Sequence, residues 1–189
     1  MHSKIEIYAA IEGAIEYHED WCRHQSSQLG IEYVPVFSKS TATYLTYISS
    51  LNQELLNNIS VIGGVENVKI LNTFRNLAAF CVLCLEFNGG CDRSDTSSEA
   101  VFLEPTLQRR RVFKMIESEV EYQNELEPSG LSISDHVIRF QHFLNEAYSD
   151  LVTKPGDEYC LSTIRILAGV CVQVMEQHGV MYPDPFEVC

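Results

Sequence analysis

Apolar residues recur every three or four positions along six stretches of the chain, and this spacing is the strongest constraint on its fold. Such a period places the apolar side chains on one face of an α-helix. The clearest stretch opens at Ser132, whose hydroxyl precedes Asp135 by three positions as in a capping box. Helices are therefore predicted over residues 4–25, 40–60, 65–87, 105–125, 132–154 and 157–179.

An all-α fold follows, because no stretch of useful length alternates with period two. We predict one domain over residues 1–189, a bundle of about six antiparallel helices joined by short connections. Residues 77–85 are apolar on nearly all sides, so the helix at 65–87 is predicted to be central and buried. A flexible loop is expected at 89–104 and an irregular tail at 180–189. We detect no internal repeat.

The net charge of −13 limits the classes of partner that the chain can bind. Nucleic acid and anionic lipid both require a basic surface, so direct binding to either, or to a membrane, is not expected. An acidic protein instead gains a faster encounter with a basic partner. The alternative interpretation is that the charge serves solubility alone.

The seven cysteines indicate a reduced chain rather than a disulfide scaffold. Their number is odd, and most lie in apolar helical stretches, where a free cysteine behaves as a small hydrophobic residue. The N-terminus has neither the basic nor the apolar region of a signal peptide. We therefore expect a cytoplasmic protein.

Motifs for catalysis are missing from the sequence. There is no phosphate-binding glycine loop, no nucleophile elbow and no His-Glu-x-x-His pair. The chain is predicted to be non-enzymatic and to need no cofactor. A zinc site is an alternative, since two pairs of potential zinc ligands each share a helical face. These ligands are His18, Cys22, Cys81 and Cys84.

The helix predicted at 105–125 has an unusual order of charges. Arg109, Arg110 and Arg111 lie in its first turns, and glutamates follow towards its end. The helix dipole favours the opposite order, by about 0.3–1 kcal/mol for each exposed charge. Local stability does not explain this pattern, and such departures tend to mark functional or strained sites. Alternatively, the arginines pair with carboxylates of the first helix.

The leading hypothesis is a protein-binding protein that docks acidic helical faces onto a basic partner, such as a nucleic-acid-binding protein. Immunity proteins, antitoxins and inhibitors belong to this class. Trp21 is the predicted aromatic anchor beside the acidic residues. The predicted contact residues are Glu12, Glu16, Glu19, Asp20, Trp21, Glu117, Glu121 and Glu125.

Two other classes of function remain open. A hydrophobic groove on the bundle could accept a helix of a partner, as scaffold modules do. A pocket inside the bundle could instead bind a small molecule or a metal, in an enzyme or a sensor. The side chains available for that pocket are His18, His136, Arg139, His142 and Tyr148.

Overall fold

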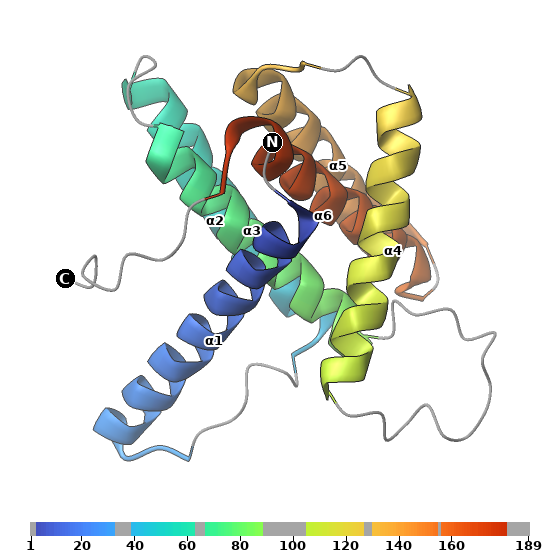
Figure 1. The fold of residues 1–189 in the computed structure, drawn as a ribbon. Coiled ribbons are helices and arrows are strands. Elements are labelled where there is room, and N and C mark those ends of the chain that lie inside the picture. The colour runs from blue at the N-terminus through green and yellow to red at the C-terminus, as the bar shows by residue number, and fades with distance from the viewer. Residues whose placement is uncertain are drawn as a thin grey trace.

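The computed structural model describes residues 3–32, 39–62, 67–88, 105–126, 130–154 and 156–180. Over these ranges the chain forms α-helices and no strands, which confirms the predicted all-α bundle (Figure 1). The predicted loop at 89–104 and all but the first residue of the predicted tail lie outside the described residues. The helices are α1 (Lys4–Leu29), α2 (Thr41–Ile62), α3 (Asn67–Asn88), α4 (Pro105–Leu126), α5 (Ile133–Thr153) and α6 (Glu158–His178).

Local capping chemistry determines where several helices begin and end. Ser3 and Ser132 each cap their helix through the hydroxyl, and the acidic residue three positions later bonds back to the cap backbone. Helix α1 continues four residues beyond the predicted end. It stops at Gly30, which adopts a left-handed φ of 64° that favours glycine.

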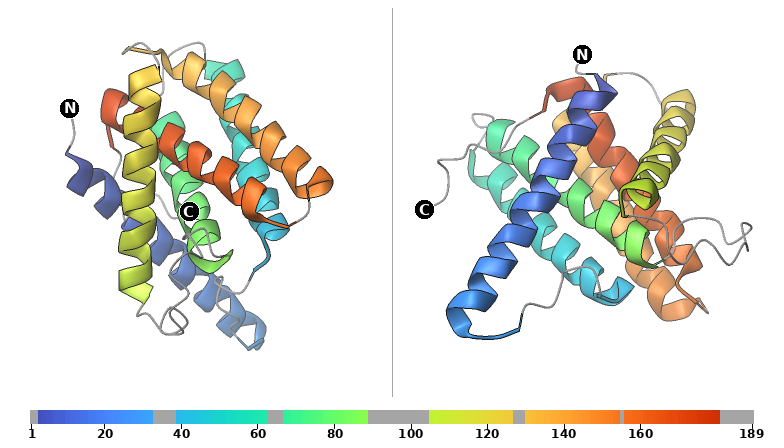
Figure 2. Two further views of the ribbon diagram at one scale, coloured as in Figure 1. Left: turned by 90° about the vertical axis from the view of Figure 1, so that its right-hand side faces the viewer. Right: turned by 60° about the horizontal axis from the view of Figure 1, so that its bottom comes forward.

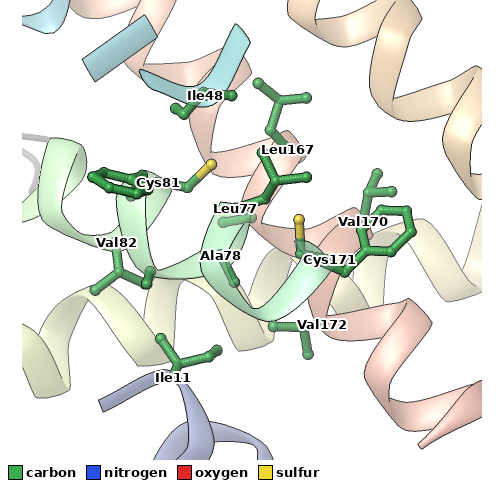
Figure 3. Close-up of a cluster of buried hydrophobic side chains, with 14 of the residues drawn as sticks. Ile11, Ile48, Leu77, Ala78, Cys81, Val82, Leu167, Val170, Cys171 and Val172 are labelled. Atoms are coloured by element: carbon green, nitrogen blue, oxygen red, sulfur yellow. The ribbon is translucent and has the colours of Figure 1, made fainter. Parts of the chain in front are cut away.

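Helices α3 and α6 pack extensively against each other, and α5 packs against α6 to a similar extent. Side chains from all six helices join them in one cluster of buried residues, part of which is shown in Figure 3. By length and composition alone, residues Val68–Asn88 and Glu158–His178 could each cross a membrane. However, 72% of each stretch is buried inside the bundle, as expected for core helices.

The contacts between helices are reciprocal, as in a twofold-symmetric dimer. Helix α3 contacts α2, α1 and α4, and α6 likewise contacts α5, α4 and α1. Cations near the start of α4 and of α1 act on equivalent carboxylates in the other half. Arg109 pairs with Glu86, and the charge of Lys4 acts against the rise that burial causes in the pKa of Glu176. Each half thus supplies the cation to one of these interactions and the carboxylate to the other, which is the pattern of a twofold interface.

The sequence supports this reciprocity directly. Helices α3 and α6 carry the same residue at eight positions 90 residues apart. These pairs are Leu71/Leu161, Thr73/Thr163, Arg75/Arg165, Leu77/Leu167, Ala78/Ala168, Cys81/Cys171, Val82/Val172 and Glu86/Glu176. Helices α1 and α4 share Ile-Glu-x-x-x-Glu-Tyr at a spacing of 105, and five buried positions of α2 coincide with buried positions of α5 at a spacing of 92.

The chain therefore contains two similar three-helix units, α1–α3 and α4–α6, packed about an internal pseudo-twofold relation. Equivalent side chains meet where the units join. The rings of Tyr8 and Phe113, 105 residues apart, stack with centroids at 4.4 Å. The prediction that the chain has no internal repeat is therefore wrong. The spacing between equivalent positions differs in each pair of helices, so a search at one fixed period misses the repeat.

Candidate functional site

The predicted contact residues lie on α1 and α4. Glu12, Glu16, Asp20, Glu121 and Glu125 are exposed, whereas Glu19 and Glu117 are half-buried. The indole of Trp21 is 50% exposed and stacks on the His18 ring at a centroid distance of 6.2 Å. The second half of α1 projects beyond its neighbours (Figures 1 and 2), and its residues after Ile15 have no buried member.

The two acidic faces occupy equivalent positions in the two units. Glu12 corresponds to Glu117 and Glu16 to Glu121 at the same 105-residue spacing. Asp20 corresponds to Glu125, so the acidic charge is also retained there. The α4 face is partly neutralised within the fold, because Lys4 Nζ lies 3.2 Å from Glu121 Oε1 and 3.9 Å from Glu117 Oε1.

The reversed charge order of α4 is partly explained by α3. Arg109 donates two hydrogen bonds, of 3.1 and 2.9 Å, to Oε2 of Glu86, whose side chain is 1% exposed. Burial raises the pKa of Glu86, and Arg109 acts against that shift. Arg109 also lowers the pKa of Glu19, against a larger rise caused by burial. The partner of Arg109 is therefore a core carboxylate, while Arg110 and Arg111 are exposed.

The alternative zinc site is not assembled. Cys22 Sγ lies 3.8 Å from His18 Nε2, but no three His, Cys, Asp or Glu side chains of the described residues converge as metal ligands. Cys81 belongs instead to the buried cluster of Figure 3, which also contains Cys171, its equivalent in the second unit. Burial raises the pKa of both thiols. Helical spacing places His18 and Cys22 on one face of α1 and Cys81 and Cys84 on one face of α3, but these two faces do not bring the four side chains together.

The side chains predicted for an internal sensor pocket are dispersed. His136 is buried beside His178, with ring centroids 5.9 Å apart and a 3.1 Å contact between His136 Nε2 and Gln177 Oε1. Tyr148 donates to the backbone oxygen of Leu45, and His142 is exposed. Of the residues predicted for that pocket, His18 lines the feature described next, whereas His136, Arg139, His142 and Tyr148 do not.

That feature is a groove of about 280 Å³ between α1, α2 and α3. Its apolar walls are Ala14, Ile15, Leu51, Ala79, Phe80 and Leu83. The His18 ring meets Phe80 edge-on at a centroid distance of 4.7 Å, and the Tyr47 ring lies 5.4 Å from Phe80. Burial, together with the charge of Lys39, lowers the pKa of His18, which favours the neutral imidazole.

Polar side chains occupy the equivalent positions of the second unit. His18 corresponds to Gln123, Tyr47 to Arg139 and Leu83 to Gln173. Arg139 donates to Gln173 Oε1 at 3.1 Å and to Gln123 Oε1 at 3.4 Å. Gln123 in turn donates to Glu119 Oε1 at 3.0 Å, where the first unit has Ala14. The network packs closely against Gly169, because a Cβ atom at this position would lie 3.0 Å from Gln123 Nε2.

Sequence reasoning did not find the groove residues Tyr47 and Phe80. Tyr47 differs from its equivalent Arg139, and this difference between the two units is the signal that distinguishes it in the sequence. The repeated heptapeptides that reveal the units, Ile-Glu-Gly-Ala-Ile-Glu-Tyr at 11–17 and Ile-Glu-Ser-Glu-Val-Glu-Tyr at 116–122, were visible in the sequence. No protein-family model, curated protein or solved structure matches the chain.

Proposed function

We propose that this protein is a non-enzymatic binding protein that docks the acidic faces of α1 and α4 onto a basic surface of a partner protein. It acts in the cytoplasm, in the manner of an immunity protein, an antitoxin or an inhibitor of a nucleic-acid-binding protein. It does not bind nucleic acid itself, because its charge repels phosphate.

The observation that supports this proposal is the repetition of exposed acidic residues between the two units. Core positions such as Ile11 and Ile116 repeat because packing requires them. Glu16 and Glu121 are exposed, and each precedes an exposed tyrosine, Tyr17 and Tyr122. An exposed carboxylate can pair with an arginine or lysine of the partner, and an exposed tyrosine ring can stack on another cation of the same basic surface.

The test combines charge reversal with partner capture. We expect wild-type protein, immobilised and exposed to a lysate of its native host, to retain a basic protein at low salt and to lose it at high salt. The double variant Glu16→Lys/Glu121→Lys should not retain that protein. Quantitative mass spectrometry of the captured fractions gives the comparison.

A matched control separates a specific face from net charge. Glu54 and Glu146 are equivalent exposed glutamates on α2 and α5, so Glu54→Lys/Glu146→Lys changes the net charge by the same amount. We expect this variant to capture the partner as the wild type does. If both variants lost the captured partner equally, the interaction would depend only on the net charge of the protein. If neither variant lost it, the proposal would be refuted. Circular dichroism melting checks that both variants fold.

A further inference from the structure

The groove between α1, α2 and α3 has the size and lining of a small-molecule site. An apolar cavity of roughly 150 Å³ is enough for benzene, and this groove offers about 280 Å³. Small-molecule sites are mainly apolar, with a few polar groups that fix the orientation of the ligand. Here the side chains of Ile15, Leu51, Phe80 and Leu83 supply apolar walls.

Tyr47 is one of the polar residues that line the groove, and its hydroxyl is bound to a cation. Its hydroxyl oxygen accepts a hydrogen bond of 2.5 Å from Lys39 Nζ, which also lies 4.6 Å from the centroid of the Tyr47 ring. Lys39 is half-buried, and its charge also lowers the pKa of His18, after the larger effect of burial. The ammonium group of Lys39 and the hydroxyl of Tyr47 therefore lie next to the apolar part of the groove.

The comparison between the two units shows that this arrangement is not required by the fold. Where the first unit has Ala14, His18 and Leu83, the second has Glu119, Gln123 and Gln173. In the second unit the arginine at the position of Tyr47 is bound by these glutamines. The same three-helix framework therefore carries a satisfied polar network in one unit and an open apolar groove in the other.

We propose that this groove binds a small apolar carboxylate, with its hydrocarbon part against Phe80 and Leu83 and its carboxylate at Lys39 and Tyr47. This site is separate from the acidic faces of the proposed function and does not depend on them. The positive charge of Lys39 selects a carboxylate over a neutral or cationic ligand of the same length. The net charge of −13 opposes any anion at long range, so a preference for one would have to arise locally.

Titration with three ligands of equal chain length tests the proposal. Decanoate, decanol and decyltrimethylammonium are added separately, and the fluorescence of Trp21 is followed. Trp21 is the single tryptophan of the chain and stacks on His18, so it reports on the groove. We expect a saturable change with decanoate at a concentration at least about fivefold lower than with the other two ligands, the scale of a half-exposed ion pair.

Two variants locate the bound ligand. Lys39→Met should remove the preference and leave the affinity for decanol unchanged. Ser50 lines the groove and is exposed, so Ser50→Phe should block all three ligands. The matched control is His142→Phe, at the equivalent exposed position of the second unit, and it should bind decanoate as the wild type does.

Three results would overturn the proposal. Equal binding of decanoate by wild type and Ser50→Phe would place the ligand elsewhere. Equal affinities for decanoate and decanol would mean that the groove recognises only an apolar surface, such as the apolar face of a partner helix. A preference for decyltrimethylammonium would show that the acidic surface, rather than Lys39, determines the choice.

Discussion

A buried ion pair connects the two units at Glu86. Its carboxylate is almost completely buried, and Arg109 supplies the opposite charge from the second turn of α4. Removing one member of a buried pair leaves an uncompensated charge, which costs more than the pair itself contributes. Arg109 therefore has a structural role that its place in an unfavourable helix turn does not suggest.

Arg109→Met is expected to lower the free energy of unfolding by about 3 kcal/mol near pH 7. Burial already raises the pKa of Glu86, and loss of Arg109 raises it further. A carboxyl whose pKa is raised on folding is more stable when protonated, so the deficit should shrink as the pH falls towards 4.5. Urea denaturation at pH 7 and pH 5 measures this change.

Two further variants check the cause of that deficit. Arg110→Met removes an exposed arginine of the same helix and should leave stability within about 0.5 kcal/mol of the wild type. Arg109→Met/Glu86→Gln removes both charges and should recover part of the loss. A pH-independent deficit in Arg109→Met would show that lost packing, and not the charge of Glu86, is responsible.

The cysteines differ in reactivity according to their surroundings. Cys81, Cys84, Cys160 and Cys171 are buried, and burial raises the pKa of each thiol, so the reactive thiolate is scarce. Cys22 is only partly buried. We expect iodoacetamide to label Cys22 in the native protein and the buried four only in urea, as peptide mass spectrometry would show. Rapid native labelling of Cys81 would contradict this packing.

At the scale of the elements, the sequence predicted helices well because their ends have local causes. Ser132 with Asp135 marks the start of α5, and the predicted and observed bounds of α3 differ by two residues at most. These features depend on neighbours in the chain, which a single sequence displays.

The groove and the ion pair could not be predicted in the same way, because they depend on which helix faces which. The direct ion pair of Arg109 is with Glu86 of α3, whereas the alternative interpretation placed its partner on α1. The ring of His18 packs against Phe80, whereas the alternative zinc site placed it near the cysteines of α3. Helical periodicity identifies a buried face without specifying what covers it. The internal repeat would have supplied that information, since it relates the helices in pairs.

Gly169 of α6 tests the polar network of the second unit. Replacing a helical glycine by alanine usually stabilises a protein by about 1 kcal/mol. Here the added Cβ would meet Gln123 Nε2 at 3.0 Å and disturb its hydrogen bonds. We expect Gly169→Ala to be destabilising, and the same change in a Gln123→Ala background to be stabilising. Urea denaturation of the wild type, the two single variants and the double variant measures these changes in the free energy of unfolding. Stabilisation by Gly169→Ala in both backgrounds would be inconsistent with the network.

At the scale of the whole molecule, the shared core of α3 and α6 should make the two units unfold together. Leu77 and Leu167 are equivalent and fully buried. Either leucine replaced by alanine should lower the free energy of unfolding by about 3 kcal/mol. Hydrogen exchange should then quicken in both α3 and α6, whichever unit carries the substitution. Faster exchange confined to the altered unit would show that the units are independently stable.

The internal pseudo-twofold also bears on how such a protein can diversify. In a homodimer of separate chains, every substitution appears twice, so both subunits must keep or lose a groove together. Joining the two copies in one chain removes that restriction, and the linkage also holds them at a high effective concentration. The second unit can then close its interior with Gln123, Arg139 and Gln173 while the first keeps His18 and Tyr47 beside open space. Because both units belong to one chain, the second unit can serve structural support while the first unit keeps a groove for recognition.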